Sequence, residues 1–288
     1  MVDEDLARVF EQRYESRYFF SADVMKQVDL ECMELTKIFR QSEKDFIALL
    51  SNVRDGCYSQ SDLTRLNERV IHRGNDDGEI VLTTTNDRAA QINGSRLNAL
   101  QGPAFQYEAT VTGKFDESAY PNDFKIVLKN GAQVMLIRND QNKRWVNGSI
   151  GYIEALSEHS IRVSVGGRVH DVPRVKWPKI QYVYDEETKR IQPEEVGTFE
   201  QYPLKLAWAI TIHKSQGQTF DNVAIELGDG AFAHGQVYVA LSRCTSFAGI
   251  RLGRPIAASD VIFDRRVLEF RKRWKSSTAR SEVTSIAR

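Results

Sequence analysis

The stretch that decides the fold is residues 206–220, which read LAWAITIHKSQGQTF. Its first half is apolar and rich in aromatic and β-branched side chains, which is typical of an interior strand in a parallel sheet. At His213 the apolar run gives way to a polar loop that contains Gly217. In open α/β sheets, ligands bind beyond the carboxyl ends of the strands. The sequence therefore predicts that residues 213–216 lie beside a ligand.

A second strand and a helix are expected after this loop. Residues 222–227 form an apolar run of strand length. Residues 233–244 have helical spacing, with Val237, Leu241 and Cys244 on one face. This alternation of strand and helix predicts an α/β domain with a parallel sheet and flanking helices.

Two further strand and helix pairs are expected nearer the start of the chain. The first is a strand that ends at Phe39 and a helix after Ser42, which with Asp45 resembles a capping box. The second is a strand over residues 80–84 and a helix after Asn86. Both pairs extend the α/β pattern.

The middle of the chain has a different character. Residues 130–203 read as short strands separated by turns, and Gly166-Gly167 is a two-residue hairpin turn between residues 161–165 and 168–169. This pattern predicts a small all-β barrel inserted into the α/β domain. The expected divisions are residues 1–128 and 205–274 for the α/β domain, 129–204 for the barrel and 275–288 for a mobile tail.

Together these segments resemble superfamily 1 helicases, in the 5′-to-3′ branch that contains the RecD-like and petite-integration-frequency (PIF) helicases. The match rests on TIHKSQG at residues 211–217 and QVYVALSR at residues 236–243, in residue type, order and spacing. LTKIFRQ at residues 35–41 and TTTN at residues 83–86 are similar to two earlier motifs of that family. The resemblance implies the second RecA-like domain, of the UvrD-like C-terminal type, and an inserted barrel of Src-homology type.

The phosphate-binding loop of such a helicase is missing from the sequence. No G-x-x-x-x-G-K-[ST] occurs: Lys114 is followed by Phe115, and Glu108 stands where the first glycine would be. The chain therefore resembles the C-terminal half of a helicase. The resemblance implies ATP and magnesium as cofactors only together with an N-terminal P-loop ATPase domain, within the full-length protein or as a separate subunit. Alone, the chain is expected to be catalytically inactive.

The resemblance also gives roles to residues that would bind the nucleotide. It implies that Arg243 and Arg40 contact the γ-phosphate, and that Gln216 and Gly217 lie against the nucleotide. Each residue has a simpler alternative: Arg243 could oppose the dipole at a helix end. Arg40 could form a structural ion pair, and the other two could belong to an ordinary loop. No metal-binding residues are expected in this chain.

Single-stranded DNA is the implied partner of a further set of residues. By resemblance, Thr211, His213 and Lys214 contact the strand backbone, because donors and positive charge suit phosphate oxygens. His213 and Lys214 could instead be solvated polar residues. Thr84 and Asn86 are either backbone contacts or only a strand end and a helix N-cap.

The expected barrel contributes a third set of candidate binding residues. Lys143 and Arg144 stand beside Trp145, a basic and aromatic combination that single-strand binders use. In the alternative, Trp145 fills the barrel core and the cations keep it soluble. We expect Lys143 and Arg144 to contact DNA and Trp177 to lie in the core.

The amino-acid composition restricts the possible functions less than the motifs do. The 39 basic and 39 acidic residues give a net charge of zero, so a DNA path must come from local charge. Three cysteines are too few and too scattered for a disulfide framework. No apolar run approaches the roughly 18 residues of a membrane span, so no membrane partner is expected. The family suggests DNA repair or recombination in the cytoplasm or nucleoid, or in the nucleus or mitochondrion of a eukaryote. The alternative function is a stand-alone nucleic-acid-binding or regulatory module without ATPase activity.

Overall fold

The computed structural model describes residues 4–28, 37–71, 79–186 and 189–273. The chain forms two compact units, Met1–Phe39 with Phe263–Arg288, and Arg40–Ile262. The expected tail at 275–288 lies outside the described residues, as does most of the strand expected before Phe39. Residues 37–39 are not in a strand.

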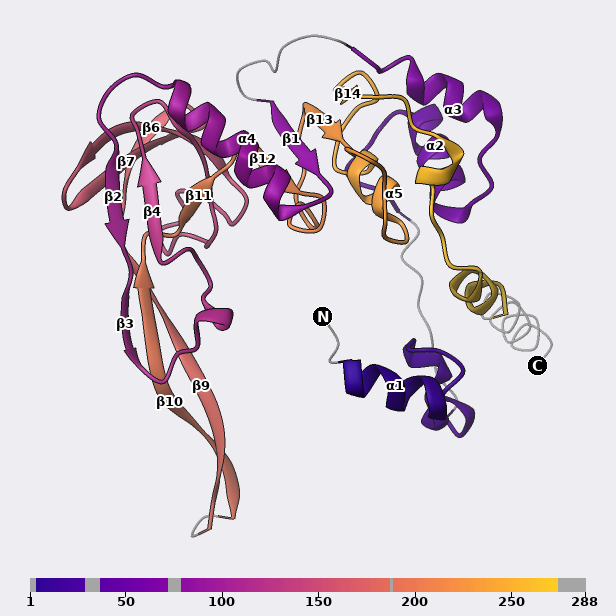
Figure 1. Ribbon diagram of the computed structural model, residues 1–288, viewed down its shortest axis with the longest axis horizontal. Coiled ribbons are helices and arrows are strands. Elements are labelled where there is room, and N and C mark those ends of the chain that lie inside the picture. Colours follow the sequence, from indigo (N-terminus) through magenta and orange to yellow (C-terminus); the bar gives the residue numbers. More distant parts are fainter. Residues whose placement is uncertain (1–3, 29–36, 72–78, 187–188, 274–288) are drawn as a thin grey trace, which may run out of the picture. The chain divides into compact units, whose positions relative to one another are not determined.

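The larger unit contains a parallel four-stranded sheet in the order β12-β1-β13-β14 (Figure 1). All three strand pairs in it are parallel, which confirms the expected α/β fold. The strands are β1 (Ile80–Thr83), β12 (Ala209–Thr211), β13 (Val223–Glu226) and β14 (Ile250–Leu252). β12 and β13 lie on either side of β1, so the loop after β12 leaves from the carboxyl end of the sheet.

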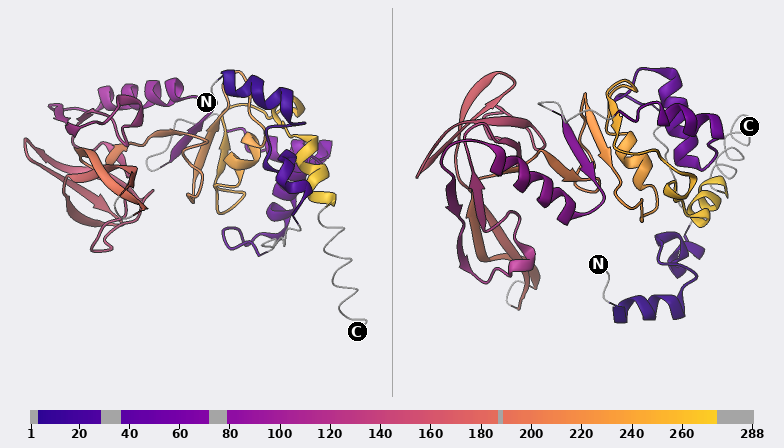
Figure 2. Two further views of the ribbon diagram at one scale, coloured as in Figure 1. Left: turned by 90° about the horizontal axis from the view of Figure 1, so that it is seen from below. Right: turned by 45° about the horizontal axis from the view of Figure 1, so that its top comes forward.

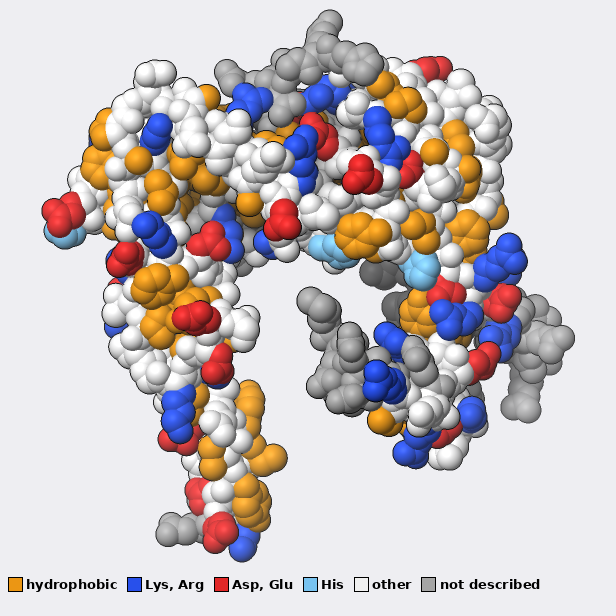
Figure 3. All heavy atoms as spheres, viewed as in Figure 1, with side chains coloured by type: hydrophobic (Ala, Val, Ile, Leu, Met, Phe, Trp, Pro, Cys, Tyr) orange, Lys and Arg blue, Asp and Glu red, His pale blue; other side chains and the backbone are white. Residues whose placement is uncertain are grey.

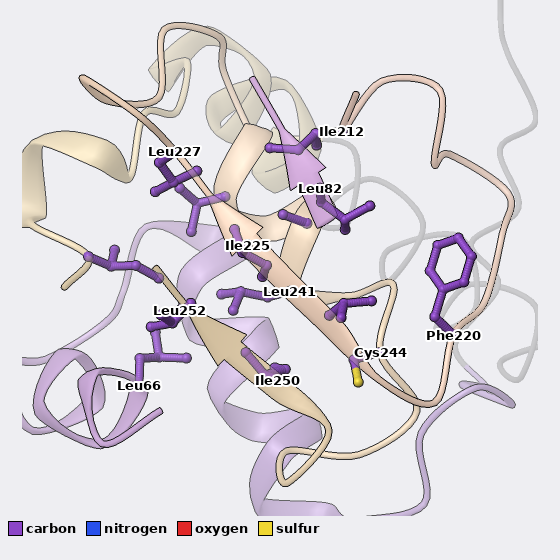
Figure 4. Packing of buried hydrophobic residues seen from close by; sticks show 14 of the residues in the cluster. Leu66, Leu82, Ile212, Phe220, Ile225, Leu227, Leu241, Cys244, Ile250 and Leu252 are labelled. Atoms are coloured by element: carbon purple, nitrogen blue, oxygen red, sulfur yellow. The ribbon is translucent and has the colours of Figure 1, made fainter. Parts of the chain in front are cut away.

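Helices cover both faces of this sheet. The face with Leu82 and Ile225 packs against α2 (Lys44–Asp55), α3 (Gln60–Asn67) and α5 (Gln236–Leu241). Figure 4 shows Leu82, Ile225, Leu241 and Cys244 converging in this core. The opposite face packs against Ala89 of α4 (Asn86–Ala99). The alternation of side chains along each strand separates the two cores.

The helix boundaries correct two expectations. α2 begins at Lys44 behind Glu43, which makes no capping hydrogen bond with its side chain, so the capping box of Ser42 and Asp45 is wrong. α5 begins only at Gln236, after Gly235 with a φ of +71°, instead of at residue 233. A residue in the left-handed region cannot continue a right-handed helix. The helix is therefore shorter than its apolar spacing suggested.

The antiparallel strands begin at Phe105 and form three sheets, ordered β11-β5-β6-β7-β8, β3-β10-β9 and β2-β4. Their closure into one Src-homology-type barrel stays a prediction. The strands are β2 (Phe105–Glu108), β3 (Thr110–Gly113), β4 (Lys125–Leu128), β5 (Gln133–Leu136), β6 (Ile150–Ser157), β7 (Ser160–Val165), β8 (Arg168–Val172), β9 (Val175–Asp185), β10 (Arg190–Gln201) and β11 (Leu204–Leu206). We call residues 105–206 the β region. It has its own core, which contains Trp145 and Leu204.

The hairpin turn expected at Gly166-Gly167 is confirmed. Val165 pairs with Arg168 across it, and both glycines have positive φ angles, +59° and +78°. A two-residue turn of this kind requires positive φ at both positions, which glycine adopts without a steric cost.

The apolar stretch at 206–212 is not one strand. The chain pairs antiparallel with β5 through Leu204–Leu206 and then parallel with β1 through Ala209–Thr211. Ala207 and Trp208 form the break between them. α4 also joins the two regions: Ala89 packs on the parallel sheet and Leu97 in the core of the β region. All the views place α4 between the two (Figures 1 and 2).

β9 and β10 continue as a long ribbon whose outer part carries exposed apolar side chains (Figures 1 and 3). Tyr182, Tyr184 and Ile191 are all more than half exposed there. Tyr184 and Ile191 pair directly, so they lie on one face of the ribbon.

The smaller unit joins segments from the two ends of the chain. It contains α1 (Glu4–Arg13), two short 3-10 helices (Phe19–Ser21 and Asp23–Lys26) and a helix over residues 265–273. Phe20 stacks on Phe270 with ring centroids 4.5 Å apart. The Tyr18 hydroxyl donates to Asp264 at 2.9 Å, and burial, followed by this carboxylate, raises the pKa of Tyr18.

The parallel sheet should be sensitive to loss of a single buried side chain. Leu82 is fully buried in β1, so Leu82→Ala should lower the free energy of unfolding by about 2–5 kcal/mol through lost burial and a residual cavity. Val169→Ala, on an exposed strand position, should change it by less than about 0.5 kcal/mol. Urea titration followed by tryptophan fluorescence measures both. Equal effects of the two substitutions would contradict the packing described for β1.

Candidate functional site

Two arginines that the sequence places far apart meet at the end of α5. Arg40 donates from Nε to the Thr219 hydroxyl at 2.8 Å and from Nη1 to the Ser242 carbonyl at 2.9 Å. Arg243 donates from Nη2 to the Ser242 hydroxyl at 3.0 Å. Its Nε donates to the Val239 carbonyl at 3.1 Å. The last contact is the helix-end interaction that the simpler alternative for Arg243 expects.

A buried glutamine sets the position of Arg40. The Gln41 side-chain amide donates to the carbonyls of Ser242 and Cys244 at 3.0 and 2.8 Å. This pair of bonds holds the start of the larger unit against the end of α5. Sequence reasoning did not assign Gln41 a role, although it stands beside Arg40 in the motif LTKIFRQ.

The electrostatics of the two arginines favour an anion. Among the described residues, neither guanidinium forms an ion pair with a carboxylate. Burial lowers the pKa of Arg243, and the positive charge of Arg40 lowers it further. Both effects disfavour the charged form, and a bound anion would relieve them. Arg40 therefore does not form the structural ion pair that its simpler alternative expects with any described residue.

The loop over residues 213–220 lies against these arginines. Arg243 Nη1 reaches the carbonyls of Ser215 and Gln218 at 3.5 and 3.4 Å. Ser215 is buried and its hydroxyl donates to the Ile212 carbonyl at 2.7 Å. Gln216 and Gly217 are exposed, and Gly217 has a φ of +82° with open space around it. The loop can therefore receive a ligand at these two positions without rearranging its buried side.

A second group of predicted residues lines a hollow of about 450 Å³ between α4 and the sheets. Thr211, Lys214 and Asn86 all border it. Thr211 is buried, and its hydroxyl accepts a bond from the Lys214 amide at 3.3 Å. Thr84 and His213 do not line this hollow. The N-cap of α4 is Thr85, which accepts from the Arg88 amide, so the expected N-cap at Asn86 is wrong.

Two lysines of the β region border the same hollow and were missed from the sequence. Lys125 lies in β4 and Lys205 in β11. Lys205 pairs with Asp123 at 3.6 Å. Lys125 and Lys214 form no ion pair within the described ranges. No sequence pattern links these three lysines, because only the fold brings them to one hollow.

Lys143 and Arg144 lie elsewhere. Arg144 borders a different hollow of about 450 Å³, together with Arg138, Arg174 and Trp145. Its guanidinium is bound to Asp140 at 2.7 Å and lies over the Trp145 ring at 4.5 Å. Lys143 is exposed, with a φ of +58°. The structure therefore does not bring this pair into the hollow that Lys214 borders.

The two tryptophans of the β region differ in burial. Trp145 is buried in the core of the β region, as its alternative reading expected. Trp177 is only half-buried; its ring centroid lies 6.0 Å from that of Phe199 and 5.5 Å from the Arg138 guanidinium. The core position expected for Trp177 is therefore wrong in part, because its ring is not fully buried.

Several known DNA helicases are similar to this chain in sequence. No protein-family model matches the chain. ATP-dependent DNA helicase PIF1 of Rattus norvegicus is 35% identical over 264 residues, which cover 88% of this chain and 40% of that protein. ATP-dependent DNA helicase Pif1 of Bdellovibrio bacteriovorus is 32% identical over 241 residues, which cover 82% of this chain and 53% of that protein.

Solved structures agree with these relatives. Unliganded Pif1 from Bacteroides sp is 35% identical with a TM-score of 0.83, covering 96% of this chain and 65% of that one. The chain is homologous to the PIF1 DNA helicases. Bacteroides Pif1 bound to ssDNA is also similar, 34% identical with a TM-score of 0.73 over 96% of this chain and 65% of that one. The homology confirms the helicase branch that the motifs at 211–217 and 236–243 resemble.

The chain spans well under two thirds of the length of the curated PIF1 relatives that it matches. Within its described residues, no cluster of His, Cys, Asp or Glu could hold a metal ion. The two arginines fit an anionic phosphate, whereas the chain supplies no carboxylate cluster for magnesium in these residues. No helix among them is long and apolar enough to cross a membrane.

The Asp140–Arg144 ion pair should make the free energy of unfolding depend on pH in the acid range. Arg144 lowers the pKa of Asp140 to about 2, below the value near 3.9 of an unfolded chain. A lowered pKa stabilises the fold above the unfolded value, and that contribution is lost as the pH falls through the folded value. Asp140→Asn should therefore reduce the free energy of unfolding at pH 7.

The difference in the free energy of unfolding between the wild-type chain and Asp140→Asn should shrink between about pH 4 and pH 2, where wild-type Asp140 becomes protonated. Denaturant titrations across this range measure it. Glu154→Gln, at an exposed position in β6, is the control. A deficit that stays constant down to pH 2 would contradict the ion-pair interpretation.

Proposed function

We propose that this chain is the C-terminal half of an ATP-dependent 5′-to-3′ DNA helicase. It would supply the second RecA-like domain, with the β region as its inserted barrel. The observation that carries the proposal is the pair Arg40 and Arg243, which hold positive charge without a carboxylate beside the loop after β12. The homology to PIF1 helicases supports the same function.

In this proposal the two arginines face the terminal phosphate of ATP. ATP, held by a separate P-loop domain with magnesium, would supply a phosphoryl group whose transfer develops negative charge on its oxygens. Arg40 and Arg243 would stabilise that charge across the interface. Their guanidiniums are already oriented by neutral hydroxyl and carbonyl oxygens, so little reorganisation is needed. Gln216 and Gly217 would approach the nucleotide from the same loop.

These proposed roles predict how ATP hydrolysis depends on the presence of both domains. The purified chain should hydrolyse ATP no faster than a buffer control, with or without single-stranded DNA, because its sequence lacks the phosphate-binding loop. Addition of the cognate P-loop domain should give DNA-stimulated hydrolysis. In that complex, Arg243→Ala should slow hydrolysis by about 10³–10⁵-fold.

Arg162→Ala is the matched control, because Arg162 is an exposed arginine in β7 outside the site. It should leave the rate unchanged. A loss below about tenfold for Arg243→Ala would return this residue to the helix-end role alone.

Single-stranded DNA is the proposed second ligand. Thr211, Lys214 and Asn86 border one hollow, and Lys125 adds positive charge to it, whereas Lys205, which also borders it, is paired with Asp123. Phosphate oxygens are acceptors, and these side chains offer donors and charge. A solved Pif1 structure from Bacteroides bound to ssDNA supports this assignment. His213, Thr84, Lys143 and Arg144 remain predicted contacts outside that hollow.

The DNA prediction concerns the salt dependence of binding. Each single-strand phosphate that is neutralised contributes roughly −0.7 to the slope of log affinity against log salt concentration. Lys214→Ala should weaken binding to every sequence alike and flatten the slope by about 0.7. Fluorescence anisotropy with labelled oligo-dT at several salt concentrations measures both.

Lys44→Ala is the control, because Lys44 is an exposed lysine in the first turn of α2 and does not border the hollow. Superimposable wild-type and Lys214→Ala curves would remove the strand-contacting role from the loop after β12.

The missing phosphate-binding loop favours one alternative. Without a partner ATPase, the same fold would act as a stand-alone nucleic-acid-binding or regulatory module. The salt titration is shared by both readings, whereas only the helicase proposal requires ATP hydrolysis on addition of a P-loop domain. A coding sequence for G-x-x-x-x-G-K-[ST], in frame or adjacent, would distinguish them in favour of the helicase.

A further inference from the structure

The β region approaches the loop after β12 at Gly148. Gly148, in the turn before β6, has a φ of +93°. A Cβ atom at this position would lie 2.8 Å from Cδ of Gln218 and 3.0 Å from its Oε1. The backbone of this turn therefore packs directly on the Gln218 side chain, and glycine is what permits the approach.

The turn that contains Gly148 is held in place because its backbone polar groups are already hydrogen-bonded. The Gly148 amide donates to the Leu136 carbonyl at 2.8 Å, and the Leu136 amide donates to the Ser149 carbonyl at 2.9 Å. The Asn147 amide donates to the Asn139 side chain at 2.7 Å. These bonds fix the turn to β5 and leave it little freedom to move away from Gln218.

The other side of Gln218 faces the candidate site. Its amide donates to the Ser215 carbonyl at 3.0 Å, and its carbonyl lies 3.4 Å from Nη1 of Arg243. The side-chain Oε1 is buried and has no hydrogen-bond donor among the described residues. An unpaired buried acceptor is destabilising, so hydrogen bonding does not explain where this side chain lies. Packing against Gly148 does.

We propose that Gln218 is a positioning residue through which the β region sets the geometry of the loop over residues 213–220. Pressure from the turn at Gly148 would hold the loop in the form that presents Lys214 on one side. The same form offers the Ser215 and Gln218 carbonyls to Arg243 on the other side. The DNA part of this inference rests on the proposed function, whereas the mechanical part does not.

Gly148→Ala tests the contact, with Gly102→Ala as its matched control. Gly102 has the same φ of +93°, but nothing lies within 4 Å of its Cβ position. Both substitutions therefore introduce similar backbone strain, and only the first pushes on Gln218. The readout is hydrogen exchange at the amides of Ser215, Gln216 and Gln218, which donate to the carbonyls of Thr211, His213 and Ser215.

Gly148→Ala should speed exchange at these three amides by at least about fivefold, because exchange reports local opening. Gly102→Ala should leave them at the wild-type rate. Similar rates in the two variants would overturn the proposal. If Gly148→Ala does not fold, Gln218→Ala carries the test: faster exchange in the loop supports the proposal and wild-type rates overturn it.

The double variant Gly148→Ala with Gln218→Ala gives the sharper result. Removing the Gln218 side chain makes room for the new methyl group. The effects of the two substitutions on the exchange rates should therefore not multiply. The double variant should exchange at least about threefold more slowly than the product of the single effects predicts, as coupled neighbours do. Independent, multiplicative effects would overturn the proposal.

Oligo-dT affinity of the same variants separates this inference from the proposed function. Wild-type chain that binds no oligo-dT, but shows the coupled exchange pattern, would refute DNA binding and keep the positioning role. Wild-type chain that binds oligo-dT but shows independent exchange effects would keep DNA binding and refute the positioning role.

Discussion

The structure depends on one short segment, residues 204–211, which belongs to two sheets. Its first part pairs antiparallel with β5 and its second part parallel with β1. Gln133 exchanges backbone and side-chain hydrogen bonds with Ala207, and the Asn93 side chain exchanges two with Ala209 at the start of β12. These bonds satisfy backbone groups at and beside the break. The chain therefore reaches Thr211 in a fixed direction, and that direction places the loop over residues 213–220.

The arginines of this chain fall into two electrostatic classes. Arg144, Arg251 and Arg254 each pair with a carboxylate at 2.6–2.7 Å, which neutralises them locally. Arg40 and Arg243 are held instead by hydroxyl and carbonyl oxygens. Such dipoles orient a guanidinium without cancelling its charge, so the charge stays available to an anion. Arg69 is also held by carbonyl oxygens, those of Ala248 and Ile250. What distinguishes Arg40 and Arg243 is therefore that both lie at the end of α5 beside the loop after β12.

Local sequence signals predicted what local geometry decides. The turn at Gly166-Gly167 needed only positive φ, and Val237 and Leu241 needed only helical spacing, whereas Cys244 lies beyond the end of α5 and forms a bridge with Phe220. The break at Ala207 could not be predicted, because its partners come from β5 and α4, far away in the sequence. For the same reason the sequence could not show that Lys125 and Lys205 join Lys214, whereas the Asp140–Arg144 ion pair is local, four residues apart, and was missed.

A net charge of zero limits what electrostatics can do for this chain. Charges further apart than about 8–10 Å are screened at physiological salt, so opposite charges elsewhere on the surface neither help nor hinder one hollow. Recognition of a phosphate backbone must then come from a few cations at short range, and short-range contacts depend steeply on where each side chain lies. The position of the loop that carries Lys214 thus matters more here than in a strongly basic protein. The positioning role proposed for Gln218, pressed by Gly148, would be the kind of constraint that a neutral nucleic-acid-binding surface requires.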